Sequence, residues 1–218
     1  MKKHILCLGD SNTHGYCADP KDCADGGIRF NEDERWTCLL QKALGDEYLV
    51  TEEGLSGRTT VFVDALHESM DALSCAYALL KSHEVVDLLI IMLGTNDTKE
   101  RFGANAACIA IGMERLAVKA ASIPAWRGGK PNILIIAPPH IGEGLYADPG
   151  WGGMGLGCPE KSRGLAERYG ELAQRLGFAF LDAEGLAEFN KKDCMHLTKK
   201  GHAQLAEKLS ALVPALIG

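Results

Sequence analysis

The sequence predicts an α/β fold in which a parallel sheet carries helices on both faces. Strand-like apolar runs alternate with helix-like segments along the chain, as is typical of such sheets. The 218 residues, 46% of them hydrophobic, are enough for one substantial core and barely enough for two. No repeat, low-complexity tract or Pro/Ser-rich linker divides the chain, so we expect residues 1–218 to form a single domain.

The predicted elements alternate in order, each strand being followed by a helix. We predict strands at the apolar runs 5–8, 48–52, 85–93, 132–137 and 178–181. We predict helices at 35–44, 64–82, 104–121, 160–176 and 198–212, with Thr198 as the N-cap of the last. The first two helices have apolar faces, made of Trp36, Leu39, Leu40, Ala43 and Leu44 in one and Met70, Leu73, Tyr77 and Leu80 in the other.

Two connections are long for a fold of this kind. Residues 16–33 are rich in Asp, Gly and Cys, and residues 142–157 are rich in glycine and include Tyr146, Trp151 and Met154. Loops of this length often wall a substrate site or contact a partner, although they can also be plain surface excursions.

Composition excludes several classes of partner. The net charge of −6 is modest and spread along the chain, so we expect neither nucleic acid nor an anionic membrane surface as a partner. No apolar stretch approaches the roughly 20 residues of a membrane span, and we expect no signal peptide. The eight cysteines are scattered and form no C-x-x-C pair, which favours thiols in a cytoplasmic protein and no metal site.

Polar, glycine-bearing turns follow the first three predicted strands. They are Gly9-Asp10-Ser11-Asn12-Thr13, the segment 54–60 with Gly57, and Gly94-Thr95-Asn96-Asp97. The carboxyl ends of parallel strands share one edge of a sheet, which is where open α/β folds place their ligands. We therefore expect the hydroxyl of Ser11, the backbone N–H of Gly57 and the amide of Asn96 to meet there.

A serine hydroxyl becomes a good nucleophile only when a base takes its proton. His196 is the best candidate, because it follows the last predicted strand, and Asp193 is close enough in sequence to hold its ring. Each feature also has an ordinary interpretation as a glycine turn, an Asx-turn or a cap for the helix near Thr198. Ser56 is a weaker rival nucleophile, and Asp10 is more readily a residue that stabilises its turn.

Competing motifs are missing. No G-x-G-x-x-G follows the first strand, and there is no G-x-x-x-x-G-K-[ST], so nucleotide binding is disfavoured. The G-x-S-x-G elbow of the α/β-hydrolases is missing as well.

At this point the sequence resembles the SGNH/GDSL hydrolase family. Its four blocks are matched in order by Gly9-Asp10-Ser11, Gly57, Gly94-Thr95-Asn96-Asp97 and Asp193-x-x-His196. Further segments are similar to the arylesterase/acyltransferase-like branch, namely Arg35-Trp36-Thr37, Glu52-Glu53-Gly54-Leu55-Ser56, Arg58-Thr59-Thr60 and the run from Ile91 to Lys99. The branch tends to carry Trp where this chain has His14. A smaller, polar group there is expected to open or rewet the acyl side of the site.

The resemblance implies a flavodoxin-like, three-layer α/β/α sandwich around a five-stranded parallel sheet. It implies Ser11 as nucleophile, His196 as base and Asp193 as its orienting acid. The implied oxyanion donors are the N–H groups of Ser11 and Gly57 and the Asn96 side chain. It also implies a serine esterase without a cofactor, acting on a small-molecule ester. Because this branch often assembles, a homo-oligomer is left open.

For the substrate we expect short, acetyl-type esters, cleaved through an acyl-serine intermediate. A carbohydrate O-acetylesterase is an alternative, since the rings of Tyr146 and Trp151 could stack on a sugar. An acyltransferase to alcohol acceptors and a binding protein that keeps the fold without turnover are further alternatives. The candidate substrate-binding residues are Asp10, Asn12, His14, Tyr146 and Trp151.

Overall fold

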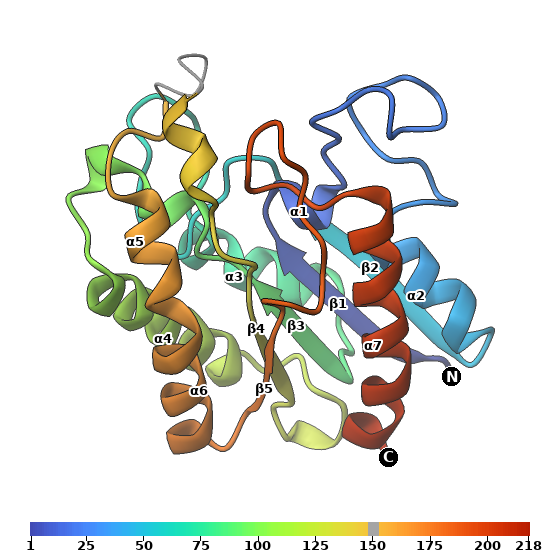
Figure 1. Ribbon diagram of the computed structural model, residues 1–218. Coiled ribbons are helices and arrows are strands. Elements are labelled where there is room, and N and C mark those ends of the chain that lie inside the picture. Colours follow the sequence, from blue (N-terminus) through green and yellow to red (C-terminus); the bar gives the residue numbers. More distant parts are fainter. Residues whose placement is uncertain (148–152) are drawn as a thin grey trace.

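The computed structural model describes residues 1–147 and 153–218 of the chain. Five strands form one parallel sheet (Figure 1): β1 Lys3–Gly9, β2 Tyr48–Gly54, β3 Leu88–Met92, β4 Ile133–Ala137 and β5 Ala179–Asp182. Their order in the sheet is β2-β1-β3-β4-β5. The predicted fold class and all five predicted strands are confirmed. The third strand is shorter than the predicted run 85–93, because only its middle pairs with both neighbours.

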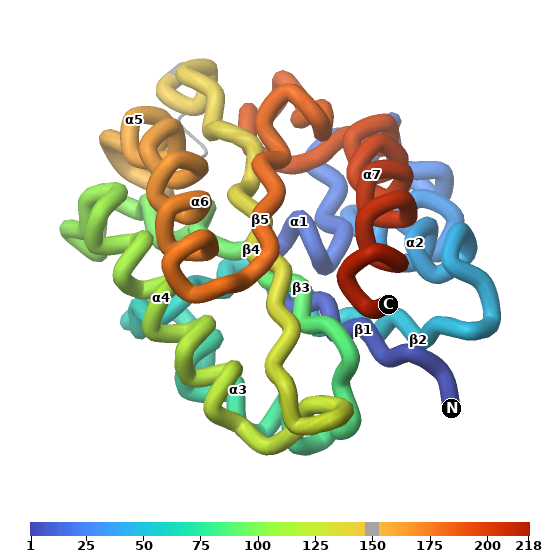
Figure 2. The backbone as a smooth tube through the Cα atoms, turned by 90° about the horizontal axis from the view of Figure 1, so that it is seen from below, coloured from blue at the N-terminus to red at the C-terminus, as the bar shows by residue number. Residues whose placement is uncertain are grey.

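The helices lie in two layers, one on each face of the sheet (Figure 2). The short α1 Ser11–His14 follows β1, and α2 Trp36–Leu44 and α7 Lys199–Ile217 cover one face. The other face is covered by α3 Ala72–Ser82, α4 Ala106–Ser122 and α6 Leu165–Leu176, and α5 Cys158–Arg163 precedes α6. Short 3-10 segments occur at η1 Asn96–Thr98, η2 Glu100–Phe102, η3 Arg127–Gly129 and η4 Glu143–Ala147.

The strands are buried on both faces because successive side chains point to opposite sides. In β1, Leu6 and Leu8 pack with the layer of α3, α4 and α6, while Ile5 and Cys7 pack with α2 and α7. The same alternation runs through β3 and β4. This explains why these strands are apolar at nearly every position.

Two of the predicted helices have different bounds in the structure. The predicted helix 64–82 begins only at Ala72, because Asp71 caps it by accepting the N–H of Ser74 at 2.8 Å. Its buried stripe is Ala72, Ala76 and Leu80, and Tyr77 is 56% exposed. The predicted helix 160–176 is two helices, α5 and α6, which meet at Gly164.

The last helix is longer than predicted. Thr198 is its N-cap, as predicted, and accepts the N–H of Gly201 at 3.0 Å. The helix then runs through Pro214 to Ile217, although a proline usually ends a helix. In the helix 35–44, Ala43 is exposed and does not belong to the predicted apolar face.

The strand order reverses between β1 and β3. In open parallel sheets, the crevice at such a switch point is the usual ligand site. Ser11 lies two residues after the end of β1, and Asn96 lies four residues after the end of β3. None of the helices among the described residues is long and apolar enough to span a bilayer. All eight cysteines are free thiols.

Candidate active site

Ser11 opens a single helical turn at the end of β1. Asp10 caps this turn, since its carboxylate accepts the N–H of Asn12 at 3.0 Å, and Gly15 ends it in the left-handed region at φ 87°. Gly54, the last residue of β2, allows the turn to tuck in closely, because a Cβ there would lie 2.2 Å from the His14 nitrogen. The turn therefore holds the Ser11 hydroxyl at the carboxyl edge of the sheet.

His196 comes from the other end of the chain and contacts Ser11 directly. Its Nε2 lies 2.8 Å from the Ser11 Oγ, and its Nδ1 lies 2.6 Å from an Asp193 carboxylate oxygen. An ionised carboxylate can only accept, so we place the ring proton on Nδ1. The lone pair on Nε2 then faces the Ser11 hydroxyl, which is the arrangement of a serine nucleophile and its base.

Asp193 is almost fully buried and yet stays ionised. Burial alone would raise the pKa of this carboxyl. The hydrogen bond and the charge of His196, together with the backbone N–H groups of His196 and Met195, outweigh burial and bring the pKa below its usual value. Both N–H groups donate to the second carboxylate oxygen at 3.1 Å.

The turn that carries Asp193 and His196 is held by Asn190. The Asn190 side chain accepts the N–H of Asp193 at 3.1 Å and donates to the His196 carbonyl at 2.8 Å. Within the turn, Cys194 adopts the left-handed region at φ 58°, which is uncommon for a residue other than glycine. The turn thus depends on tertiary support.

The two other predicted turns reach the same cavity. Gly57 lies there at φ +93°, a conformation that side chains disfavour, and Asn96 lies there at the start of η1. The Asn96 Nδ2 is 3.5 Å from the Oδ2 of Asp10, whose other oxygen caps the turn after β1. The structure therefore brings together Ser11, Gly57, Asn96 and His196, with Asp193 behind the histidine.

Asn12 and Asp10 lie behind this site. The Asn12 side chain accepts the N–H of Leu197 at 2.9 Å and donates to the Met195 carbonyl at 3.2 Å, which ties the turn after β1 to the histidine turn. Neither Asn12 nor Asp10 is among the residues that line the cavity, and both are 1% exposed. Their side chains support the site from within the protein.

The cavity beside Ser11 has a volume of about 380 Å³, within the usual range for small-molecule sites. It is lined by Ser11, Tyr16, Ser56, Gly57, His67, Thr95, Asn96, Lys99, Arg101, Gly153, Met154, Met195 and His196. Within residues 1–147 and 153–218, no group of three or more His, Cys, Asp or Glu side chains is arranged to hold a metal ion.

Several lining residues were missed by the sequence reasoning. The Tyr16 ring lies 4.6 Å from the His196 ring, centre to centre, and His67, Lys99 and Arg101 also face the cavity. Lys99 and Arg101 lie just beyond the Gly94–Asp97 turn, so extending that turn by four residues would have found them. Tyr16 and His67 carry no such signal, because they lie in irregular segments.

Besides Asp10 and Asn12, two further predicted substrate contacts, His14 and Tyr146, are not among the described residues that line the cavity. His14 is half-buried beside Arg29 and Glu52, and burial together with the Arg29 charge lowers the pKa of its ring. The hydroxyl of Tyr146 donates to Glu160 at 2.7 Å and accepts the N–H of Gly157 at 2.9 Å. The remaining predicted contact, Trp151, lies outside the described residues.

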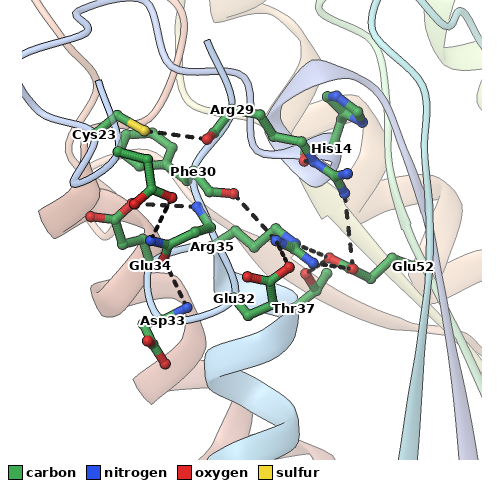
Figure 3. A network of polar contacts seen from close by, with 12 residues as sticks. His14, Cys23, Arg29, Phe30, Glu32, Asp33, Glu34, Arg35, Thr37 and Glu52 are labelled. Carbon is green, nitrogen blue, oxygen red and sulfur yellow. Dashed lines mark hydrogen bonds and ion pairs between the residues drawn. The ribbon is translucent and has the colours of Figure 1, made fainter. Parts of the chain in front are cut away.

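The segment that carries Tyr16 is fastened to the sheet by a polar network (Figure 3). Arg35 donates to Glu52 through Nε at 2.6 Å and Nη2 at 2.8 Å, and through Nη1 to the Phe30 carbonyl at 3.3 Å. Glu34 accepts the N–H of Ala24 at 2.9 Å and the Nζ of Lys199 at 2.9 Å. These contacts connect the segment to β2 and to the first turn of α7.

The chain matches the model of the GDSL-like lipase/acylhydrolase family over residues 7–204. Among proteins with curated functions, none matches the sequence. Two solved structures are similar over almost their whole length. An aryl esterase from M. smegmatis is 34% identical, with 98% of this chain and 99% of that chain covered and a TM-score of 0.88. A carbohydrate acetylesterase from Sinorhizobium meliloti is 32% identical, with 99% and 100% covered and a TM-score of 0.89.

These matches agree with the geometry of the site. Ser11, His196 and Asp193 are joined by two successive hydrogen bonds at the switch point of the sheet, beside a cavity of small-molecule size. Both of these similar proteins are esterases. The chain belongs to the GDSL-like lipase/acylhydrolase family and is a serine-dependent carboxylic ester hydrolase.

Proposed function

We propose that the protein hydrolyses short-chain, acetyl-type esters through an acyl-serine intermediate formed on Ser11. The observation that carries the proposal is the hydrogen-bonded series from Ser11 to His196 to Asp193, with heavy-atom distances of 2.8 and 2.6 Å. These distances lie within the reach needed for proton transfer between a nucleophile and its base.

In the first half of the reaction, the Ser11 oxygen attacks the ester carbonyl while its proton moves to the Nε2 of His196. The imidazolium that forms is stabilised by the Asp193 carboxylate, which keeps its own charge. The carbonyl oxygen becomes negative and accepts hydrogen bonds from the N–H groups of Ser11 and Gly57 and from the Asn96 amide. His196 then returns the proton to the departing alcohol, and the acyl group stays on Ser11.

In the second half, a water molecule replaces the alcohol. His196 takes a proton from the water as its oxygen attacks the acyl carbonyl, and the same donors hold the negative oxygen. Collapse of the intermediate breaks the bond to Ser11, and His196 returns the proton to the serine oxygen. The carboxylic acid leaves, and the site is restored.

The size of the cavity supports small substrates. Its volume of about 380 Å³ is near the lower end of the usual range, roughly 300–1,000 Å³, for small-molecule sites. Met154, Met195 and the Tyr16 ring supply apolar walls beside the nucleophile. A short acyl group and a compact alcohol fit this description better than a long lipid chain does.

A carbohydrate O-acetylesterase is a second candidate. It is favoured by the similarity to the carbohydrate acetylesterase from Sinorhizobium meliloti. The two candidates differ only in the alcohol, which the first leaves unspecified and the second takes to be a sugar hydroxyl. The aromatic stacking first expected from Tyr146 does not add support, because Tyr146 is not among the described residues that line the cavity.

The test combines a substrate panel with a covalent trap. We expect turnover of phenyl and sugar acetates to exceed that of the corresponding butyrates and octanoates. In rapid-quench mass spectrometry with an aryl acetate, the protein should gain one acetyl group on the peptide that contains Ser11. The control is Ser74→Ala, an exposed serine in α3, which should acylate as the unaltered protein does.

Two results would overturn the proposal. One is the same acetyl mark on the Ser11→Ala protein, which would place the nucleophile elsewhere. The other is equal or faster turnover of octanoate esters, which would exclude the short-chain specificity.

A further inference from the structure

One wall of the cavity is basic and is organised around a single buried acid, Asp64. Its carboxylate receives Nε and Nη2 of Arg101 at 3.1 and 2.7 Å, and Nζ of Lys99 at 3.3 Å. The Nδ1 of His67 lies 3.3 Å from the same carboxylate. We call Asp64, His67, Lys99 and Arg101 the basic wall.

The acid of the basic wall faces the protein and the bases face the cavity. The Asp64 side chain is 0% exposed, whereas those of Lys99, Arg101 and His67 are 8%, 25% and 51% exposed. Lys99, Arg101 and His67 line the cavity, and Asp64 does not. The hydrogen bonds from Arg101, helped by the N–H of Leu66 and the charge of Lys99, overcome burial and lower the pKa of Asp64. Asp64 therefore stays ionised and fixes the bases in place.

No Asp or Glu is among the described residues that line this cavity. The neighbouring acids are engaged elsewhere. Glu100 accepts the N–H of Leu156 at 2.9 Å, and Asp97 accepts the N–H of Thr60 at 2.9 Å. Asp10 lies fully buried under the nucleophile turn and accepts the N–H of Asn12. A ligand in the cavity thus meets the ammonium of Lys99 and the guanidinium of Arg101 on this wall, while the Asp64 carboxylate lies behind them.

Arg101 and Lys99 have more N–H groups than they donate to Asp64. A guanidinium has five N–H groups, and Arg101 uses three of them in its described contacts, two with Asp64 and one with the Gly153 carbonyl. Lys99 has three N–H groups and uses one on Asp64. The wall can therefore donate charge-assisted hydrogen bonds to a further acceptor.

We propose that the physiological ester carries an anionic group, such as a carboxylate, on its alcohol part, and that Arg101, Lys99 and His67 bind that group. The inference rests on the proposed function, because it concerns the substrate of the same site. Because the acyl group at Ser11 is short, the alcohol part makes up most of the ester. The alcohol must then lie along the remainder of the cavity, where the basic wall stands. Arg101 and Lys99 lose little side-chain entropy on binding, because Asp64 already holds them.

The test uses a matched pair of substrates, 3-acetoxybenzoate and its neutral analogue 3-acetoxybenzamide. The leaving phenols are similar, so the ratio of their kcat/KM values reports the contribution of the carboxylate. We expect the unaltered protein to favour the anionic ester by on the order of 10-fold at low ionic strength, as for a charged hydrogen bond. The preference should shrink as salt is added, since the side chains are partly exposed.

The variants Arg101→Gln and His67→Gln should each lower the ratio by at least about threefold, with Arg101→Gln having the larger effect. The matched control is Arg175→Gln, which breaks a two-contact pair with Glu114 on an exposed part of α6 and should leave the ratio unchanged. His67 is half exposed, so its variant gives a result even if Arg101→Gln fails to fold. A ratio near one in the unaltered protein, or an unchanged ratio in both variants, would overturn the inference.

A binding measurement separates this inference from the proposed function. By titration calorimetry, 3-hydroxybenzoate should bind the Ser11→Ala protein about 10-fold more tightly than 3-hydroxybenzamide does, and His67→Gln should reduce that difference. Equal affinities would overturn the inference. If the unaltered protein hydrolysed neither acetate while the Ser11→Ala protein still bound the anionic phenol more tightly, the proposed function would be refuted and the inference about the basic wall would stand.

Discussion

Asp193 acts on His196 through both of its carboxylate oxygens. One accepts the ring N–H at 2.6 Å, and the other accepts two backbone N–H groups at 3.1 Å. The first contact sets which ring nitrogen carries the proton, and the second fixes the direction of the carboxylate. The two functions can be separated by substitution.

In Asp193→Asn, the amide oxygen should keep the two backbone contacts, and the NH2 group should then face the Nδ1 of His196. The ring would have to accept at Nδ1 and carry its proton on Nε2, so it could no longer receive the Ser11 proton. We expect kcat for an aryl acetate to fall about 10⁴-fold, as for this substitution in other triads. Thermal unfolding serves as the control for the fold. A loss below tenfold with an intact fold would contradict the role of Asp193.

Asn96 provides the only side chain among the three proposed oxyanion donors. Asn96→Ala removes its amide and leaves the backbone donors of Ser11 and Gly57 in place. Because the contact forms with the negative oxygen and not with the ground-state ester, kcat should fall roughly 10²–10³-fold with little change in KM. Steady-state kinetics with phenyl acetate measure this. A rise in KM at constant kcat would instead assign Asn96 to ground-state binding.

At the scale of elements, the segment 16–33 depends on side-chain contacts for its position. It brings Tyr16 to the ring of His196 and is anchored by Arg35, Glu34 and Glu52. Thr37 in α2 also hydrogen-bonds to Glu52. The anchor therefore joins the segment, α2 and β2.

Glu52→Gln tests this anchor. The Arg35 side chain is 8% exposed and would lose its nearest ionic partner, keeping a longer contact of 3.7 Å to the exposed Glu32. We therefore expect the free energy of unfolding to fall by roughly 2–3 kcal/mol. The control is Glu114→Gln, whose Arg175 partner is 59% exposed, and which should cost at most about 1 kcal/mol. Urea unfolding compares the two. Equal effects would mean that the anchor is no stronger than a surface pair.

His202 lies where α2 meets α7. Its Nδ1 accepts the backbone N–H of Trp36 at 3.2 Å, its ring packs on Phe30, and it is fully buried. Burial, with a smaller contribution from the charges of His196 and Arg35, lowers the pKa of His202 to about 3. Between that value and the ordinary histidine pKa of about 6.5, the unfolded chain binds a proton that the native protein excludes.

This histidine should therefore destabilise the protein as pH falls below about 6.5. In His202→Asn, the amide oxygen can replace Nδ1 as acceptor and does not titrate. From pH 7 to 4.5, the unaltered protein should lose roughly 2–3 kcal/mol of stability relative to the variant. Asp10 and Asp97, whose pKa values burial raises to about 6, act in the opposite direction but titrate in both proteins. Parallel urea titrations at several pH values would contradict this account if the two stability curves stayed parallel.

At the scale of the whole molecule, the strands could be predicted because both sheet faces are buried. The polar turns could be predicted because they follow those strands directly. The predicted start of α3 is wrong. The helical spacing of apolar residues already includes Met70, but Asp71 is the N-cap and the helix begins after it. The basic wall could not be predicted, because Asp64 meets Lys99 and Arg101 only through tertiary contacts. Likewise, nothing in Asp193-Cys194-Met195-His196 signals the left-handed Cys194.

Two predictions about the whole chain await measurement. A single domain over residues 1–218 should unfold in one cooperative transition. Light scattering will determine whether the chain forms a homo-oligomer.

The central claim is that Ser11 is the nucleophile of an ester hydrolase. Its most direct test is kcat/KM for p-nitrophenyl acetate with the unaltered protein and with Ser11→Ala, both confirmed as folded. We predict a loss of about 10⁴-fold or more, because the Ser11 hydroxyl lies 2.8 Å from the Nε2 of His196, within reach of proton transfer. Equal rates in the two proteins, or a comparable loss in Ser56→Ala instead, would contradict the claim.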